Sequence, residues 1–456
     1  MAKRNLASVI DNLLVKVFNK KLPINLELWD GSISESIGSN CKIIVRSPNA
    51  FKRLLFAPGE LGLARAFISG DLDLEGSIFD LVDLRKAIAD DYGKVNLNFN
   101  LKVKFEILKS LIHLKAVGLP PKPPSIEIKP ISRIGKSLHS KSRDKEDISY
   151  HYDVSNEFYR TFLGPTMVYS CGYFGNDYNR KLEPTLEQAQ LDKCDLVCRK
   201  LQLKDGQRLL DIGCGWGTLL IYAAKKYNIR GVGVTLSKQQ FEYATLKIKE
   251  LNLDDRIEVR LQDYRDIKNE VFDAICSIGM AEHVGKAELK QYFKKVYSLL
   301  TDQGRFLNHA ISRPKDDGRK SGTTGRNSFI NRYVFPDGEL EEVGYLINTM
   351  QNSNFEVRDV ESLREHYAKT LKCWVNNLEE NVDEAVKLVG EQRYRVWRLY
   401  MAGSSVTFSD NNVSIHQVLG VKTSKSGSAN IPLSRLKWIF DLTKKTPELS
   451  DIEPDK

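Results

Sequence analysis

Three glycines that alternate with other residues are the part of the sequence with the clearest chemical meaning. Residues 209–217 read LLDIGCGWG, so Gly213, Gly215 and Gly217 follow an apolar stretch and precede a helical pattern. Glycines at such a place allow a tight turn and a close approach of the backbone to a ligand. The charge of Asp211 would repel a phosphate, but it suits a cation such as the amino group of a methionine moiety.

Two other uses of a glycine-rich loop are disfavoured. A dinucleotide site needs GxGxxG and an acid after the next strand, whereas this loop is GxGxG and the next predicted strand ends in Thr235. A P-loop is excluded because no Gly-Lys-Ser/Thr follows. Asp263 and Tyr264 close a later predicted strand, where the acid can accept a hydrogen bond from an adenine amino group and the ring can cover the base. These positions, taken with Asp211, predict a site for S-adenosylmethionine.

The elements that must position these residues alternate between strand and helix patterns. This alternation predicts an α/β fold with a doubly wound, Rossmann-like sheet, as in class I S-adenosylmethionine methyltransferases, whose ligands lie at the carboxyl ends of the strands. Strands are expected at residues 208–212, 231–235, 257–261, 272–278 and 304–311, and helices at 185–201, 218–227, 238–251 and 286–300.

A chain of 456 residues suggests two domains. Five prolines between residues 116 and 146 disfavour regular helix there, and residues 115–145 carry eight Lys or Arg against two acids, which would attract an anionic surface such as a membrane or nucleic acid. The predicted parts are a smaller mixed α+β N-terminal domain (1–115, with a helix at 5–18 and a strand at 42–45), a basic Pro-rich linker (116–146), a catalytic domain (147–420) and a polar basic tail (421–456).

Several classes of protein are excluded by composition. No apolar run is long enough to span a membrane, and the N-terminus lacks the apolar core and cleavage site of a signal peptide, so we expect a cytoplasmic protein. The seven cysteines form no CxxC pair or other zinc-like spacing, which predicts reduced thiols and no metal site.

Seven further segments occur in an order that resembles the cyclopropane-fatty-acid synthase family, which includes the mycolic acid cyclopropane synthases. The resemblance covers about residues 147–420. The segments are HYDVSNEFYRTFLGPTMVYSCGYF from residue 151, GVTLSKQQ from 233, LQDYRD from 261, GMAEHVG from 279, NHAIS from 308, FPDGEL from 335 and HYAKTL from 366.

The resemblance implies addition of the methyl carbon of S-adenosylmethionine across a cis double bond of an acyl chain, with bicarbonate as the base that takes a proton for ring closure. It places Cys171, Glu282, His309, Ile311 and Tyr367 around bicarbonate. Cys171 and Ile311 would contribute backbone groups, Glu282 would accept a hydrogen bond, and His309 and Tyr367 would donate. A thiolate nucleophile at Cys171 is not required, because transfer from a sulfonium to an alkene needs no covalent intermediate.

The resemblance also assigns cofactor contacts. Tyr169 and Ser170 would lie near the methionine end of S-adenosylmethionine, and Thr235, Leu236 and Gln240 would contact its ribose and adenine. The sequence QDYRD and the separate N-terminal domain match the branch of the family that modifies phospholipids rather than the mycolic acid branch.

An alkene is a poor nucleophile, so the methyl donor must be held in line with it, and water must be kept from the carbocation that forms. Aromatic faces can stabilise such a cation, although aromatic residues at these positions also suit core packing. The aromatic residues that cluster before the glycine loop are Tyr150, Tyr152, Phe158, Tyr159, Phe162, Tyr169, Tyr173 and Phe174.

The sequence as a whole predicts an enzyme that cyclopropanates unsaturated phospholipid acyl chains. It would be held by its linker at the anionic inner face of the membrane, with the N-terminal domain recruiting lipid or forming a homodimer. A fatty-acid methyltransferase giving a methyl- or methylene-branched chain is the first alternative, and the intact Glu282-His283 pair favours the ring.

A lipid-binding protein with a vestigial cofactor fold is disfavoured by the intact glycines. Nucleic-acid modification is disfavoured because no base-reading Asn/Asp-Pro-Pro-Tyr motif is present, so no nucleic-acid partner is expected.

Overall fold

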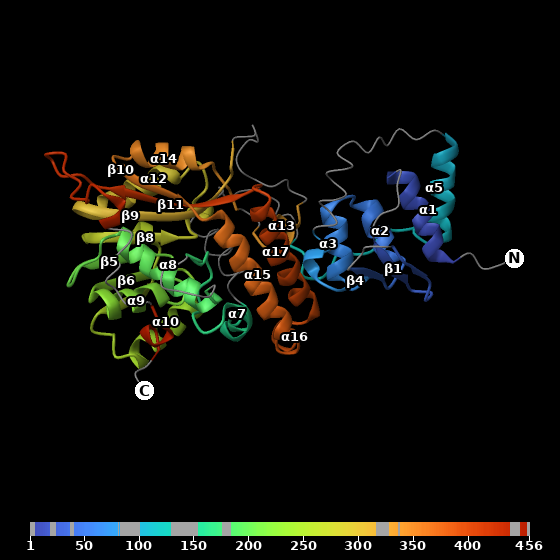
Figure 1. Ribbon diagram of the computed structural model, residues 1–456, viewed down its shortest axis with the longest axis horizontal. Coiled ribbons are helices and arrows are strands. Elements are labelled where there is room, and N and C mark those ends of the chain that lie inside the picture. Colours follow the sequence, from blue (N-terminus) through green and yellow to red (C-terminus); the bar gives the residue numbers. More distant parts are fainter. Residues whose placement is uncertain are drawn as a thin grey trace. The chain divides into compact units, whose positions relative to one another are not determined.

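The chain folds into two compact units, which are described separately (Figure 1). The computed structural model describes residues 5–18, 24–36, 41–80, 82, 101–128, 154–175, 184–315, 328–335, 338–437 and 447–453. The smaller unit comprises Met1–Pro130, Gly325–Val334 and Val389–Val406, and the larger one Ile131–Thr324, Phe335–Leu388 and Thr407–Lys456.

The larger unit contains a seven-stranded sheet with the order β10-β11-β9-β8-β5-β6-β7. Neighbouring strands from β9 to β7 are parallel, whereas β11 runs antiparallel to both β9 and β10. The strands are β5 (Arg208–Ile212), β6 (Arg230–Thr235), β7 (Ile257–Leu261), β8 (Phe272–Ile278), β9 (Leu300–Ser312), β10 (Glu356–Ser362) and β11 (Ser414–Val421).

Helices cover both faces of this sheet (Figure 1). The helices of the larger unit are α7 (Asn156–Leu163), α8 (Leu186–Lys200), α9 (Thr218–Tyr227), α10 (Lys238–Glu250), α11 (Ala281–Val284), α12 (Leu289–Ser298), α14 (Val343–Gln351), α15 (Arg364–Glu380) and α16 (Val382–Val389). The doubly wound α/β class predicted from the sequence is therefore confirmed. Each predicted strand and helix of the sheet region is present with ends that differ by a few residues.

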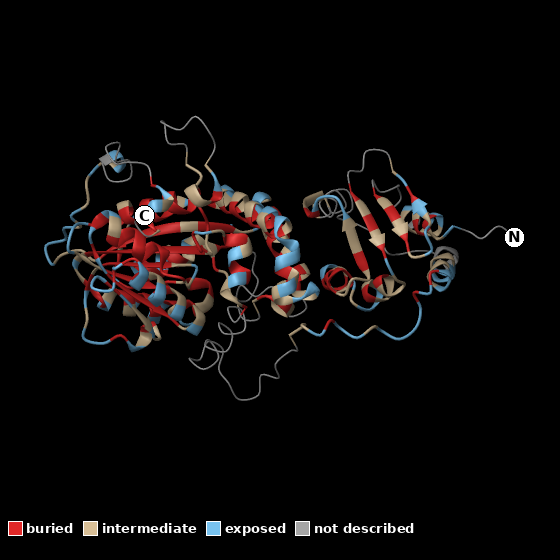
Figure 2. Cartoon of the chain, turned by 90° about the horizontal axis from the view of Figure 1, so that it is seen from below, coloured by how far each residue is buried: buried red, intermediate tan, exposed pale blue. Residues whose placement is uncertain are grey.

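The apolar run in β5 reflects burial on both faces of the sheet. Successive side chains of a strand point to opposite faces. Leu209 accordingly packs in a cluster with α8 and α9, while Leu210 packs in a second cluster with α12 and α14. Figure 2 shows the resulting buried strands between more exposed helices. From β5 the chain adds β6 and β7 on one side, and it then adds β8 and β9 on the other side of β5. Open α/β sheets bind ligands beside such a switch point, at the carboxyl ends of the strands.

The smaller unit is a mixed α+β fold, as predicted. It has a four-stranded sheet of order β2-β1-β3-β4, and α1 lies beside α5 (Figure 1). Its elements are α1 (Leu6–Phe18), β1 (Asn25–Leu28), β2 (Ile33–Ser34), β3 (Lys42–Val45), α2 (Asn49–Phe56), α3 (Glu60–Ile68), β4 (Leu72–Glu75), α5 (Leu101–His113), α13 (Phe329–Tyr333) and α17 (Glu391–Ser409), the last of which belongs to this unit through Val406.

Two later segments complete the smaller unit, although the sequence predicts a catalytic domain (147–420) that contains them. Tyr333 donates a hydrogen bond of 2.8 Å to Glu127, which also receives two from Arg65. Arg395 forms an ion pair of 3.2 Å with Asp73. Hydrophobic patterning cannot reveal such long-range ion pairs, because they depend on which segments meet in space.

The two basic segments predicted from the sequence lie partly outside the described residues. These are the linker beyond Ile128 and the amphipathic stretch from residue 438 to 446. The described end of the tail packs on the larger unit, where Ile452 joins the cluster of α8 and α9 and Asp451 pairs with Lys226 at 2.5 Å. Among the described residues, no helix is long and apolar enough to cross a bilayer.

Candidate functional site

The predicted glycine loop leads from the carboxyl end of β5 into α9. Its three glycines all have positive φ angles, 81° at Gly213, 55° at Gly215 and 84° at Gly217, which other residues rarely adopt. A Cβ at Gly217 would also lie 3.2 Å from the Cβ of Ala244. The loop therefore requires glycine both for its backbone conformation and for the close approach of α9 to α10.

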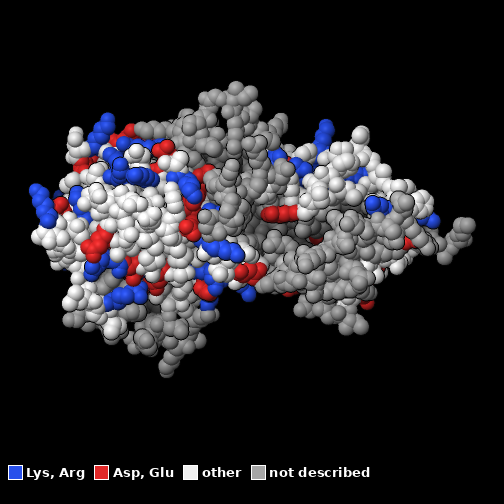
Figure 3. Space-filling view, turned by 90° about the horizontal axis from the view of Figure 1, so that it is seen from above, with Lys and Arg blue, Asp and Glu red and all other residues white. Residues whose placement is uncertain are grey.

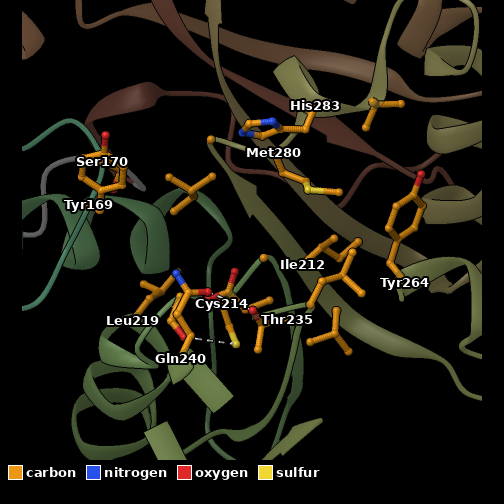
Figure 4. A pocket seen from close by; sticks show the side chains of 18 of the residues that line it. Tyr169, Ser170, Ile212, Cys214, Leu219, Thr235, Gln240, Tyr264, Met280 and His283 are labelled. Carbon is orange, nitrogen blue, oxygen red and sulfur yellow. Dashed lines mark hydrogen bonds between the residues drawn. The ribbon is translucent and has the colours of Figure 1, made fainter. Parts of the chain in front are cut away.

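A cavity of about 200 Å³ opens beside this loop (Figure 4). Side chains from the segment before α8, from the glycine loop and from the ends of β6, β7 and β8 converge on it. Of the eleven residues predicted to contact the cofactor, ten line the cavity: Tyr169, Ser170, Asp211, Gly213, Gly215, Thr235, Leu236, Gln240, Asp263 and Tyr264. Gly217 does not line it and instead begins α9.

Asp211 is the buried acid of the cavity. Burial raises the pKa of its carboxyl to about 6, while the Cys276 thiol, 3.4 Å from Oδ1, and the nearby Lys193 ammonium oppose that rise. A cationic ligand group at this carboxylate would offset the unfavourable burial of its charge. Lys193 also lines the cavity, although the motifs in the sequence do not point to it. The sequence does contain one indication that Lys193 is buried. It lies three residues before Leu196 and seven after Leu186, so it falls on the apolar stripe of α8.

Other polar side chains shape the part of the cavity predicted to hold ribose and adenine. The Thr235 hydroxyl donates to Gln240 Oε1 at 2.9 Å, and this fixes the orientation of the amide (Figure 4). The Asp263 carboxylate receives hydrogen bonds from the backbone and guanidinium of Arg265. The ring of Tyr264 packs edge-on against Tyr292 at 5.2 Å, so the wall of the cavity is fixed at this point.

The segment that carries Tyr169 and Ser170 is anchored on α8. Gln190 donates to the carbonyl of Ser170 at 2.8 Å, and the Tyr173 N–H donates to the carbonyl of Ala189 at 2.8 Å. Lys193 then donates to the Ser170 hydroxyl at 3.1 Å. α8 therefore sets the position of this wall of the cavity.

A chain of aromatic rings extends from the cavity into the larger unit. Trp216 and Tyr169 line the cavity, and their ring centroids lie 5.0 Å and 5.7 Å from that of Tyr159. Trp374 lies 5.3 Å from Tyr169 and 6.0 Å from Tyr367. Phe158 and Phe162 pack in the same cluster, and Tyr173 stacks on His366. The predicted residues Tyr150 and Tyr152 lie outside the described part of the chain.

Glu282 lies in α11, next to the carboxyl end of β9. Its Oε1 accepts a hydrogen bond of 2.7 Å from the backbone N–H of Ile311, while Oε2 is buried and has no partner within the described chain. Burial raises the pKa of this carboxyl to about 7. The structure therefore brings Glu282 and Ile311 together. The sequence predicts that the Ile311 backbone contacts bicarbonate, but in the structure its N–H donates to Glu282 instead.

His309 lies on β9 opposite Ile278 of β8, and it is fully buried. The Gln417 amide donates to its Nδ1 at 3.2 Å, so the proton of the neutral ring is on Nε2. That Nε2 has no hydrogen-bond partner among the described residues. Burial, aided by nearby Lys193 and Lys200, holds the pKa of His309 well below its usual value. The neutral ring therefore presents a buried N–H donor.

Cys171 and Tyr367 both contact the carbonyl of Leu363. The Cys171 thiol lies 3.7 Å from that oxygen, and the backbone N–H of Tyr367 donates to it at 3.0 Å. Burial raises the pKa of the thiol, so Cys171 is not a thiolate at neutral pH. None of the five residues predicted around bicarbonate lines the 200 Å³ cavity.

Comparisons with known proteins agree with this arrangement. Residues 139–418 match the family model described as mycolic acid cyclopropane synthetase. The chain is 40% identical to a probable fatty acid methyltransferase of Mycobacterium tuberculosis over 90% of its own length and 94% of that protein, and 38% identical to one of Pseudomonas putida over 91% and 95%. It also superposes on a mycolic acid cyclopropane synthase complexed with SAH and CTAB, with TM-score 0.56, 33% identity, and coverage of 61% of this chain and 98% of that one.

Family, fold and glycine loop thus agree on a methyl donor as the bound cofactor. We conclude that the chain belongs to the mycolic acid cyclopropane synthetase family of S-adenosylmethionine-dependent methyltransferases.

Proposed function

We propose that the enzyme adds the methyl carbon of S-adenosylmethionine across a cis double bond of a phospholipid acyl chain and closes a cyclopropane ring. One alkene carbon gains a bond to the methyl carbon as the carbon–sulfur bond breaks, and the other alkene carbon becomes cationic. Loss of a proton from the added carbon then leaves the electron pair that closes the ring. The buried Glu282 carboxyl, one oxygen of which has no hydrogen-bond partner among the described residues, is the observation that carries this proposal.

A base bound beside the cation would favour the ring over a branched product. A methylene-branched product requires a hydride shift between the chain carbons before the proton is lost, and prompt removal of the proton precludes that shift. A saturated methyl branch would require a reductant in addition. The named relatives leave this choice open, because two are called probable fatty acid methyltransferases and the matching family is named for cyclopropane synthesis. The branched product is therefore the second candidate.

Two buried polar atoms without partners among the described residues would suit bicarbonate. Bound there it would supply the proton acceptor, and a bicarbonate ion has both a hydroxyl donor and oxygen acceptors. The free Oε2 of Glu282 can accept from the hydroxyl, and the free Nε2–H of His309 can donate to an oxygen. In this proposal Ile311 acts by holding Glu282, while the Cys171 backbone and the Tyr367 hydroxyl complete the pocket.

The aromatic chain suits the acyl substrate. Tyr159 and Trp374 are buried and pack against Tyr169, which is half-buried and lines the cofactor cavity. These rings can help to exclude water, and Tyr169 can present its face to a cationic carbon.

Identification of the lipid product tests the proposal directly. The enzyme is incubated with mixed unsaturated phospholipids and S-adenosylmethionine labelled in its methyl group. We expect labelled lipid that has lost its double bond and shows cyclopropane protons by NMR. A labelled product that keeps its unsaturation would establish the methylene branch instead, and unlabelled lipid would refute an acyl-chain substrate.

We also propose that the smaller unit attaches the enzyme to an anionic membrane surface. On α5 the side chains of Phe105, Leu108 and Ile112 recur on one helical face and are 68%, 48% and 59% exposed, and the exposed residues Lys104 and Lys109 lie beside them. A helix with an apolar face flanked by lysines suits the interface of an anionic bilayer. On the visible face of the larger unit, by contrast, basic and acidic side chains are interspersed (Figure 3).

Binding to phosphatidylglycerol vesicles should therefore fall as salt rises, because salt screens the attraction of lysines to the lipid. Replacement of Phe105 and Ile112 by serine should weaken binding at every salt concentration. The control replaces Leu55 and Phe56, exposed apolar residues of α2 in the same unit. Equal losses in both variants, or binding that is independent of salt, would contradict this assignment.

A further inference from the structure

Lys193 is a buried cation that forms no ion pair with the described residues. Its side chain lines the cofactor cavity and the residue is 2% exposed. The Ser170 hydroxyl, 3.1 Å from Nζ, is its hydrogen-bond partner, and Nζ forms no ion pair within the described part of the chain. An ammonium group in such a place is unfavourable unless an anion compensates it.

Lys200 provides a comparison on the same helix. It is also fully buried, two turns further along α8, but its ammonium lies 3.3 Å from Asp359 and 2.5 Å from Glu361. The larger unit thus supplies carboxylates to Lys200, the buried lysine that does not line the cavity. Lys193, which lines the cavity, receives no carboxylate from the described residues, so the missing anion is a property of the cavity.

The charges around the cavity match an amino acid zwitterion. Asp211 and Lys193 both line it, and they lie near enough for the Lys193 ammonium to act on the pKa of Asp211. An α-amino acid group carries its ammonium and carboxylate on one carbon. A ligand whose amino group lies at Asp211 therefore has a carboxylate within reach of Lys193 and the Ser170 hydroxyl.

We infer that Lys193, together with Ser170, binds the carboxylate of the methionine moiety of S-adenosylmethionine. Lys193 is thus a cofactor-positioning residue. It holds the amino acid end so that the sulfonium methyl has a fixed place in the cavity. This inference rests on the cofactor and not on the ring product, so it is tested by binding in the absence of lipid.

The test compares ligands with and without a carboxylate. Calorimetry measures the affinity of the full chain for S-adenosylhomocysteine and for its decarboxylated form. The wild type should prefer the first by about 10- to 100-fold, the range of a charged hydrogen bond. Lys193→Met should lose this preference by binding S-adenosylhomocysteine more weakly, and Lys193→Arg should retain most of it.

Thermal unfolding separates a binding role from a structural one. Without ligand, Lys193→Met should be at least as stable as the wild type, because it removes a buried charge that forms no ion pair with the described residues, but S-adenosylhomocysteine should raise its Tm much less. Lys200→Met is the matched control. It should lower the Tm, because Asp359 and Glu361 lose their partner, and it should keep the preference for the carboxylate.

Two results would overturn the inference. An undiminished preference for S-adenosylhomocysteine in Lys193→Met would show that another group binds the carboxylate. Unchanged binding combined with turnover that requires more bicarbonate would assign Lys193 to the base, which its proximity to His309 makes the competing role. Absence of a lipid product would affect only the proposed function, since neither binding result depends on it.

Discussion

Replacement of Glu282 by glutamine is expected to lower turnover by about 100-fold or more, the usual contribution of a group that serves proton transfer. The amide oxygen can still accept from Ile311, so the fold is preserved, but the carboxylate that supports the base is lost. Affinity for S-adenosylmethionine should stay within about twofold, because Glu282 does not line the cofactor cavity. Steady-state kinetics and calorimetry give the two quantities.

The pH dependence provides an independent check on Glu282. Burial raises the pKa of its carboxyl to about 7, so the group is protonated below that pH and gains its charge above it. Turnover at saturating cofactor should rise through pH 7 in the wild type, and this rise should be absent in Glu282→Gln. Glu341→Gln is the control, because Glu341 is also buried but pairs with Lys286 at 2.7 Å. A glutamine variant of Glu282 with full activity would refute the role.

Replacement of Asp211 by asparagine should weaken S-adenosylmethionine binding by about 10- to 100-fold, since a hydrogen bond to a charged group is lost in a buried site. Burial raises the pKa of Asp211 to about 6, so wild-type affinity should decline as the pH falls below 6 and the carboxylate becomes neutral. Asp211→Asn should not show this decline. Calorimetry between pH 5 and 8 measures both effects.

Asp273→Asn is the matched control for Asp211. It changes an acid of the adjacent strand β8 near its amino end, where the carboxylate accepts from the backbone N–H of Arg208 at 2.8 Å. Cofactor affinity should be unchanged in this variant. A loss of equal size in both variants would indicate a general disturbance of the sheet, and unchanged affinity in Asp211→Asn would remove Asp211 from the site.

The sequence predicts the parallel part of the sheet well because its strands are continuous apolar runs separated by helices. β10 and β11 were not predicted. β11 lies between β9 and β10 and is antiparallel to both. The local hydrophobic periodicity of a segment does not specify which strands it pairs with in the sheet. The glycine loop was predictable because its chemistry is local, and ten of the eleven proposed cofactor residues line one cavity.

The remaining site features depend on contacts between distant segments. Nothing in the sequence near Ile311 indicates that its N–H is taken by Glu282, or that Gln417 fixes the proton position of His309. Lys193 was missed because a lysine is usually read as an exposed residue, and its helical stripe alone indicated burial. Hydrogen-bond partners and charge compensation are properties of the folded chain, and spacing does not encode them.

The interleaved composition of the smaller unit affects how this protein is made. During translation, the first 130 residues leave the ribosome long before Tyr333 and Arg395 are synthesised. The contacts of Glu127 with Tyr333 and of Asp73 with Arg395 can therefore form only later. The carbonyl of Phe67 likewise receives the Arg395 guanidinium only then, at 3.1 Å. A gene fragment ending near residue 146 would encode these acceptors without the donors that Tyr333 and Arg395 supply. The smaller unit is therefore completed late in synthesis, after most of the catalytic sheet has been translated.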